Sequence, residues 1–452
     1  MAGYVVQFLR LVGEHPYLID RCPELAQYVA MAQYGRMSEG MAKSMLFQLE
    51  EAIDLSTDYP CFLHRAPRED QLLANGKPEI EFLTLQEGEG ELRCGIRLAD
   101  RPRHMLVAGS TGSGKTTALR NVITRVHEMN SREGDERQKT SVLVLQIKPT
   151  DFTDLGRLLG PAWLIFSVHA GMKLGLNGPD VVPPELWTQM IATWFSVRAG
   201  LINARVALAG IIRWLLPILN PEGTAPLRWP SWENILEALR KMPKNVFGAK
   251  SVYMQSLETM LYDVVQSTGG LLQSWRGLDL ETQVVAQGKN AVLDLSNIYP
   301  PWIRLYIVDY LVSQLLIGRM YARHRADTTE VLLVIDEADA LVSRQAAASF
   351  QGELSPVDTV LKMGRAFGIA SCIGLTAMGS ASRQILSNVQ YHLCMNMSDE
   401  ESVQEARRTL MLPRGAELQF PALQPGEAIF REAQGAWPHP MLVKVDYVPP
   451  SQ

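Results

Sequence analysis

A glycine-rich segment of the sequence has the residue types of a phosphate-binding loop. Residues 109–116, Gly-Ser-Thr-Gly-Ser-Gly-Lys-Thr, satisfy the G-x-x-x-x-G-K-[ST] pattern. Glycines let the backbone turn tightly, so that several N–H groups point into one concave nest, and the positive end of a following helix favours the same anion. The apolar run Met105–Ala108 precedes the loop, and an amphipathic run follows it. This context favours a nucleotide site over a strand–helix turn with a chance lysine.

The residues of this loop have separate expected roles. Lys115 would reach the β- and γ-phosphates, and the hydroxyl of Thr116 would coordinate Mg²⁺. We therefore expect ATP and Mg²⁺ as ligands, with GTP as the alternative nucleotide because no residue plainly reads the base. The expected nucleotide contacts are Gly109, Ser110, Thr111, Gly112, Ser113, Gly114, Lys115, Thr116 and Thr117.

A pair of acids after a second apolar run completes the predicted site. Asp336 and Glu337 follow Val331–Ile335 directly, which is a Walker B pattern. Asp336 would hold the Mg²⁺ shell, because hard cations prefer carboxylate oxygen. Glu337 would act as the general base that polarises the attacking water. The alternative is an acidic turn after a core strand, but the phosphate loop upstream favours the catalytic interpretation.

Phosphoryl transfer also needs positive charge on the γ-phosphate, often from an arginine of a neighbouring subunit. Arg365 is the candidate for this role, just before the apolar run 370–375. A structural or solvated arginine is the alternative interpretation. Arg383 and Arg414 are weaker candidates.

The composition is that of a folded protein without a global attraction for nucleic acid. Of its 452 residues, 47% are apolar and 20% are charged, and the net charge is −5. Any contact with nucleic acid would therefore be local. The five cysteines are scattered without a C-x-x-C pair, and the eight histidines are dispersed. This usage argues against a disulfide framework or a zinc site, and we expect a cytoplasmic protein.

One long apolar segment, Ile191–Leu219, has the length of a membrane span. Arg198, Arg205 and Arg213 interrupt it along one helical face. A charge near the centre of a bilayer costs about 2.5–3.5 kcal/mol on insertion scales. We therefore expect one long amphipathic or buried helix and no direct insertion into a membrane.

The order of apolar runs predicts an α/β fold with a mostly parallel central sheet. From Arg103 onward, buried runs alternate with helical patterns, apart from an almost entirely helical stretch over 185–287. A helix is expected over Ile303–Ala326. The expected strands are 80–85, 92–97, 105–108, 141–146, 163–168, 291–295, 331–335, 370–375, 391–395, 427–431 and 441–445.

These patterns divide the chain into four predicted parts. An N-terminal accessory region of helices and a short β element covers 1–100. The first part of the ATPase core covers 101–184, and an all-α insertion covers 185–287. The second part of the core and the tail cover 288–452.

With these residues considered together, the chain resembles the HerA/FtsK superfamily of hexameric P-loop motor ATPases, which includes the conjugative coupling proteins. The resemblance covers about residues 100–445, and the order and spacing of its motifs make it more specific than the phosphate loop alone. The motifs are His104–Thr116, Lys148-Pro149, Ala291–Ser296, Asp336-Glu337, Gly364–Ile369, Ile385–Val389 and Pro425–Phe430.

The resemblance implies a RecA-like core, assembly into a homo-hexameric ring, and movement of double-stranded DNA through a central pore. Three features depart from the family pattern. Thr376-Ala377 stands where many members have a Thr-Gln sensor, and Gln146 replaces a usual acid. The N-terminal segment matches neither the membrane helices of coupling proteins nor the β-barrel of HerA.

The sequence is therefore compatible with three functions. The leading one is an ATP-driven translocase of double-stranded DNA, with a nuclease or a mobile-element machine as the expected partner and with Arg240–Lys250 and Ser131–Lys139 as candidate pore loops. The second is a nucleotide-dependent oligomeric scaffold that assembles a partner such as a nuclease, which the absent sensor amide and the acidic net charge favour. The third is the energising ATPase of a secretion or conjugation system.

Overall fold

The structure is a computed structural model of the 452-residue chain. It describes residues 3–14, 19, 25–54, 67–86, 92–98, 102–132, 139–149, 152–167, 173–221, 226–242, 251–268, 271–272, 274–351, 353–412 and 416–447.

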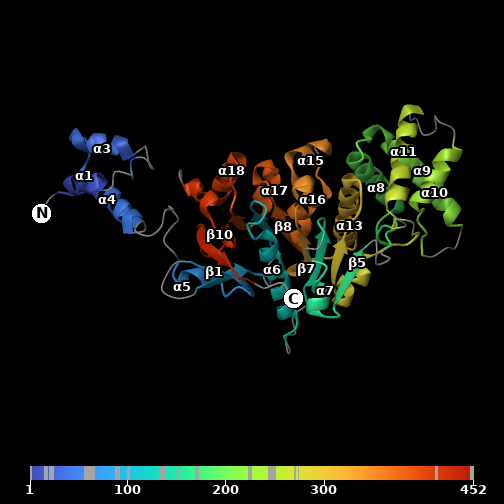
Figure 1. The fold of residues 1–452 in the computed structure, drawn as a ribbon, viewed down its shortest axis with the longest axis horizontal. Helices are drawn as coiled ribbons and strands as arrows, with labels where there is room; N and C mark the ends of the chain where they lie inside the picture. Colours follow the sequence, from blue (N-terminus) through green and yellow to red (C-terminus); the bar gives the residue numbers. More distant parts are fainter. Residues whose placement is uncertain are drawn as a thin grey trace.

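One large sheet crosses the described chain (Figure 1). Its strands are β1 (Ile80–Leu85), β2 (Arg93–Ile96), β3 (Met105–Ala108), β4 (Ser141–Gln146), β5 (Trp163–Ser167), β6 (Asn290–Asp294), β7 (Ala326–Ile335), β8 (Phe367–Leu375), β9 (Tyr391–Met395), β10 (Glu427–Glu432) and β11 (Met441–Val445). They form an 11-stranded sheet in the order β2-β1-β11-β10-β9-β3-β8-β7-β4-β6-β5. In this spatial order, the neighbours from β2 as far as β9 pair antiparallel. The neighbours from β9 onward to the other edge at β5 pair in parallel.

Helices cover both faces of the sheet. They are α5 (Glu69–Leu72), α6 (Lys115–Asn130), α7 (Leu155–Leu159), α8 (Pro184–Arg198), α9 (Arg205–Leu219), α10 (Trp232–Lys241), α11 (Ser251–Ser267), α12 (Leu280–Gln283), α13 (Pro301–Tyr321), α14 (Asp339–Val342), α15 (Arg344–Ser349), α16 (Pro356–Met363), α17 (Arg383–Asn388) and α18 (Glu400–Leu410). Alternate residues of β3 point to opposite cores, with Leu106 and Ala108 on one side and Met105 and Val107 on the other. Strands buried on both faces explain the continuous apolar runs of the sequence. The predicted α/β fold with a mostly parallel sheet is confirmed.

The helices α8–α11 lie between β5 and β6 in the chain, and α8 and α10 pack against α13. Phe195 of α8 stacks on Trp232 of α10 with ring centroids 4.8 Å apart, and it meets Tyr306 of α13 edge to face. Arg198 donates to the fully buried carboxylate of Asp309 over 2.6 Å. Breaking a buried ion pair by removing one partner costs about 3–5 kcal/mol, so this contact fixes the helical layer on the core.

Two predicted helices have different bounds in the structure. The single helix expected over Ile191–Leu219 is broken after Arg198, because Gly200 has φ +68° and α9 begins only at Arg205. The helix expected to reach Ala326 ends at Tyr321, because Arg323 adopts the left-handed φ of +54° and β7 already begins at Ala326.

One stretch of the described chain, Ile202–Leu219, is long and apolar enough to cross a membrane, and 44% of it is buried. Its α9 portion places Leu208, Ile211 and Ile212 in the core that α8 and α13 share. Packing of this kind is that of a core helix in a globular layer.

The N-terminal region contributes to two separate cores. Helices α1 (Tyr4–Glu14), α3 (Leu25–Gln33) and α4 (Glu39–Asp54) pack around a small cluster of their own and stand apart from the sheet in Figure 1. Strands β1 and β2, by contrast, extend the main sheet, since Leu83 of β1 pairs with Val445 of β11. The sheet thus reaches into the region that the sequence assigns to an accessory unit.

The burial of His104, which precedes β3, predicts that the stability of the fold depends on pH. It is fully buried, and burial, with a contribution from Arg365, lowers its pKa to about 3. The unfolded chain takes up this proton below about pH 6.5, so stability is complete above that pH and falls as the pH drops toward 3. At pH 5 we expect a loss of about 2 kcal/mol from this residue.

Urea unfolding at pH 8 and pH 5 checks this expectation. The difference in unfolding free energy between the two pH values should be smaller in His104→Leu than in the wild type, by about 2 kcal/mol. The same pH dependence in both proteins would contradict it.

Candidate nucleotide site

The predicted phosphate loop connects the carboxyl end of β3 to α6. Gly112 and Gly114 have φ +84° and +110°, a conformation that residues with a Cβ rarely adopt. A Cβ on Gly114 would also lie 3.0 Å from the Cε of Met395 in β9. The backbone at Gly112 and Gly114 is therefore in a conformation that favours glycine.

Neighbouring strands hold this loop in place. The N–H of Gly109 donates to the carbonyl of Leu375 at the end of β8 over 3.1 Å. The N–H of Ser110 donates to the carbonyl of Asn396, just after β9, over 2.7 Å, and the Ser110 hydroxyl donates to the same oxygen. The loop is thus fixed by strands on both sides of β3.

The predicted lysine is buried over its own loop. The Nζ of Lys115 donates to the carbonyls of Gly109 over 2.8 Å and Ser110 over 3.0 Å, and the residue is 6% exposed. Burial lowers the pKa of Lys115, and the carboxylates of Asp336 and Glu337 oppose that shift. The ammonium group therefore lies where the nest and the acidic pair meet.

Thr116 and Asp336 form the second part of the site. They are 220 residues apart in the sequence, yet the Thr116 hydroxyl donates to Oδ2 of Asp336 over 2.7 Å. A Cβ on Gly374 of β8 would lie 2.3 Å from Oδ1 of Asp336, so the strand between β3 and β7 must carry glycine here. Burial raises the pKa of Asp336, and the hydrogen bond from Thr116 opposes this. A hydroxyl beside a carboxylate fits the oxygen ligands that Mg²⁺ takes.

Glu337 lies at the same edge of the sheet in an uncommon backbone conformation. Its φ is +54°, and its N–H donates to Oδ1 of Asp336 over 2.9 Å. Its Oε1 pairs with the Nζ of Lys148, just beyond β4, over 2.6 Å. The sequence marks Lys148 only as part of the family resemblance, and its contact with Glu337 was not expected.

The third acid of this segment has a structural role. The carboxylate of Asp339 accepts from the N–H groups of Thr376 and Ala377, at distances of 2.8–3.1 Å. It ties the turn after β7 to the end of β8. The side chain of Ala377 is a methyl group, so it supplies no amide at the end of β8.

Arg365 does not join these residues within one chain. It lies in the short helix Gly364–Ala366 directly before β8. Because β3 and β8 run parallel, Arg365 is at the amino ends of the strands, whereas the phosphate loop follows the carboxyl ends. It lines a cavity of about 530 Å³ with Arg325, Ala326, Asp327, Ala366 and Gln434.

The other basic candidates are only partly described. Arg383 begins α17 and is exposed, whereas Arg414 lies outside the described residues. Of the candidate pore loops, 133–138 and 243–250 also lie outside the described residues.

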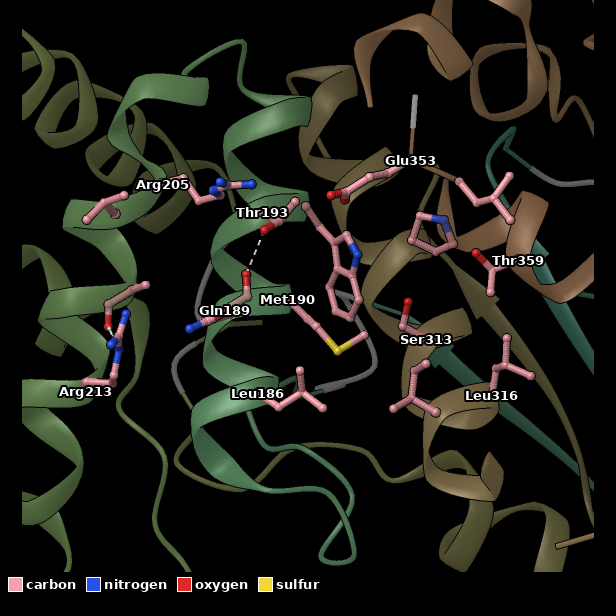
Figure 2. A pocket seen from close by; sticks show the side chains of 16 residues that line it. Leu186, Gln189, Met190, Thr193, Arg205, Arg213, Ser313, Leu316, Glu353 and Thr359 are labelled. Carbon is pink, nitrogen blue, oxygen red and sulfur yellow. Dashed lines mark hydrogen bonds between the residues drawn. The ribbon is translucent and has the colours of Figure 1, made fainter. Parts of the chain in front are cut away.

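A further cavity lies away from the nucleotide site, between the helical layer and the core (Figure 2). It encloses about 640 Å³. Leu186, Met190 and Thr193 of α8 face Ser313 and Leu316 of α13 across it. None of the residues of the phosphate loop or the acidic pair lines it.

The fold is similar to several solved structures. It aligns with VirB4 of Thermoanaerobacter pseudethanolicus at a TM-score of 0.60 and 16% identity, over 83% of this chain and 97% of that chain. It aligns with the bacterial conjugative coupling protein TrwBdeltaN70 at 0.56 and 13%, over 77% and 85%. It aligns with TrwB in complex with ADP and Mg²⁺ at 0.51 and 14%, over 76% and 86%. No protein-family model and no curated protein matches the sequence.

Proposed function

From the RecA-like P-loop fold of the HerA/FtsK type, we propose that the chain hydrolyses ATP to energise a conjugation or secretion machine. The observation that carries the proposal is the convergence of Lys115, Thr116, Asp336 and Glu337 at one edge of the sheet. The likeness to a conjugative coupling protein, and to TrwB with ADP and Mg²⁺, supports the same class of function and ligands.

Each residue of the site has a defined task in this proposal. The loop N–H groups and Lys115 bind the phosphates, and Thr116 and Asp336 hold Mg²⁺. The bound cation supplies positive charge for the phosphate oxygens. Glu337 orients a water molecule and accepts its proton.

The position of Arg365 favours a ring of identical copies. Arg365 is at the opposite edge of the sheet from the phosphate loop of its own chain. An arginine placed there can serve a nucleotide only in a neighbouring copy. We propose this role in trans, within a homo-hexamer, because arginines supplied by a neighbouring protein are a recurrent part of phosphoryl-transfer sites.

Translocation of double-stranded DNA is a second candidate function. The coupling-protein likeness favours it. The net charge of −5 requires that any DNA contact come from local basic loops. A scaffold with little hydrolysis is the remaining alternative, and Ala377 in place of a sensor amide favours it.

The steady-state ATPase rate, measured with and without linear double-stranded DNA, tests the proposal when oligomeric mass is determined in the same buffer. Hydrolysis by a ring-sized particle is the expected result. Strong stimulation by DNA would identify a DNA translocase, and hydrolysis without stimulation would favour a secretion energiser. A near-zero rate from a well-assembled ring would refute the ATPase and leave the scaffold.

A further inference from the structure

The ion pair between Lys148 and Glu337 is the unexpected feature of the site. Strands β4 and β7 are parallel neighbours, with Leu145 opposite Ile335. Lys148 and Glu337 follow these positions at the same edge, which brings together residues 189 apart in the sequence. The ammonium group of Lys148 thus contacts the carboxylate of Glu337, the group that is proposed to activate water.

The phosphates of a bound nucleotide would compete with Glu337 for Lys148. Lys148 lies close enough to Lys115 for its charge to contribute, after burial, to lowering the pKa of Lys115. Two ammonium groups that face one site repel each other unless an anion lies between them. The phosphates of a bound nucleotide carry that negative charge, and Lys115 is their expected ligand.

Lys148 can leave its ion pair with Glu337 for another anion at small cost. The side chains of Lys148 and Glu337 are 47% and 32% exposed, and exposed ion pairs contribute little to stability. Lysine is a flexible point charge with rotatable donors, so it can change partners at small cost. Ala377 supplies no amide that would contact the phosphate from β8 instead.

We propose that Lys148 is a γ-phosphate sensor, which holds Glu337 in its resting position and exchanges that carboxylate for the γ-phosphate of bound ATP. Loading with ATP then releases Glu337 to bind the attacking water, whereas ADP leaves the ion pair in place. This inference rests on the proposed function and assigns to β4 the sensing task that the end of β8 lacks.

The preference for a triphosphate over a diphosphate tests the sensor. We would measure the affinities of the full chain for ATPγS and ADP, with Mg²⁺, by calorimetry. Lys148→Met should lower the ratio of the two affinities about tenfold, because a charged hydrogen bond made only by the γ-phosphate is lost. Lys148→Arg should retain most of the ratio. Lys77→Met, which breaks the pair of this lysine with Glu81 of β1, should leave it unchanged.

A second substitution tests the exchange itself. Glu337→Ala removes the competing carboxylate, so ATPγS affinity should rise more in the wild-type background than in Lys148→Met. Equal increases, or an unchanged ratio in Lys148→Met, would overturn the inference while leaving the ATPase intact. A wild-type chain that binds neither nucleotide would overturn the proposed function and the sensor with it.

Discussion

Replacing Lys115 with alanine is expected to lower the ATPase rate by about 100- to 1,000-fold, the usual effect of losing one preorganised donor at developing charge. The lysine is 6% exposed and lies between the phosphate nest and the acidic pair. Its loss leaves the phosphates without their only buried ammonium among the described residues. The rate at saturating ATP and Mg²⁺ is the measurement.

The same variant should remain folded, because backbone hydrogen bonds to neighbouring strands still hold the loop when the two bonds from Lys115 to Gly109 and Ser110 are lost. Gly109 is held by Leu375, and Ser110 is held by Asn396. Thermal unfolding of Lys115→Ala should therefore stay close to that of the wild type. A folded variant whose rate falls less than about tenfold would refute the assigned role.

Glu337→Gln is expected to lower kcat by about 100- to 10,000-fold while nucleotide binding persists. Glutamine keeps the size of the side chain but cannot accept the proton of water. The phosphate loop and the contact between Thr116 and Asp336 are unaffected by the change. Parallel measurement of kcat and of ATP affinity separates the two effects.

Glu353→Gln provides the matched control for this substitution. Glu353 lines the cavity of about 640 Å³ beside α8, away from the nucleotide site (Figure 2). Its replacement should leave kcat unchanged. A Glu337→Gln protein that retains most of its turnover would show that another group is the base.

Mixing two inactive proteins then tests the role of Arg365 in trans. Rings formed from Arg365→Ala and Glu337→Gln subunits contain some interfaces with an intact Arg365 facing an intact Glu337. Partial recovery of hydrolysis is the expected result. No recovery in a mixed ring that is shown to assemble would count against this role.

The sequence predicted those features that depend on short, strongly patterned segments. The phosphate loop, the acidic pair and the buried strands of the parallel sheet fall in uninterrupted motifs or apolar runs, so their identity is local. The meeting of Thr116 with Asp336 followed from the motif chemistry, although 220 residues separate them.

Features that depend on the order of strands were beyond sequence reasoning. The contact between Lys148 and Glu337 requires that β4 lie beside β7, and no local pattern encodes that neighbour. Likewise, the distance of Arg365 from its own phosphate loop follows from the parallel pairing of β3 with β8. The helix break at Gly200 was not predictable from the sequence, because the apolar pattern continues across it.

The pairing of β1 with β11 covers a strand edge that would otherwise be exposed. Strand β11 has β10 on one side and β1 on the other, through Leu83 and Val445 among others. A fragment that starts at residue 100 would leave one side of β11 with unpaired backbone donors and acceptors. Unpaired strand edges recruit strands from other chains and promote aggregation. The hairpin of β1 and β2 therefore shields the inner strands from self-association, with β2 taking the outer position.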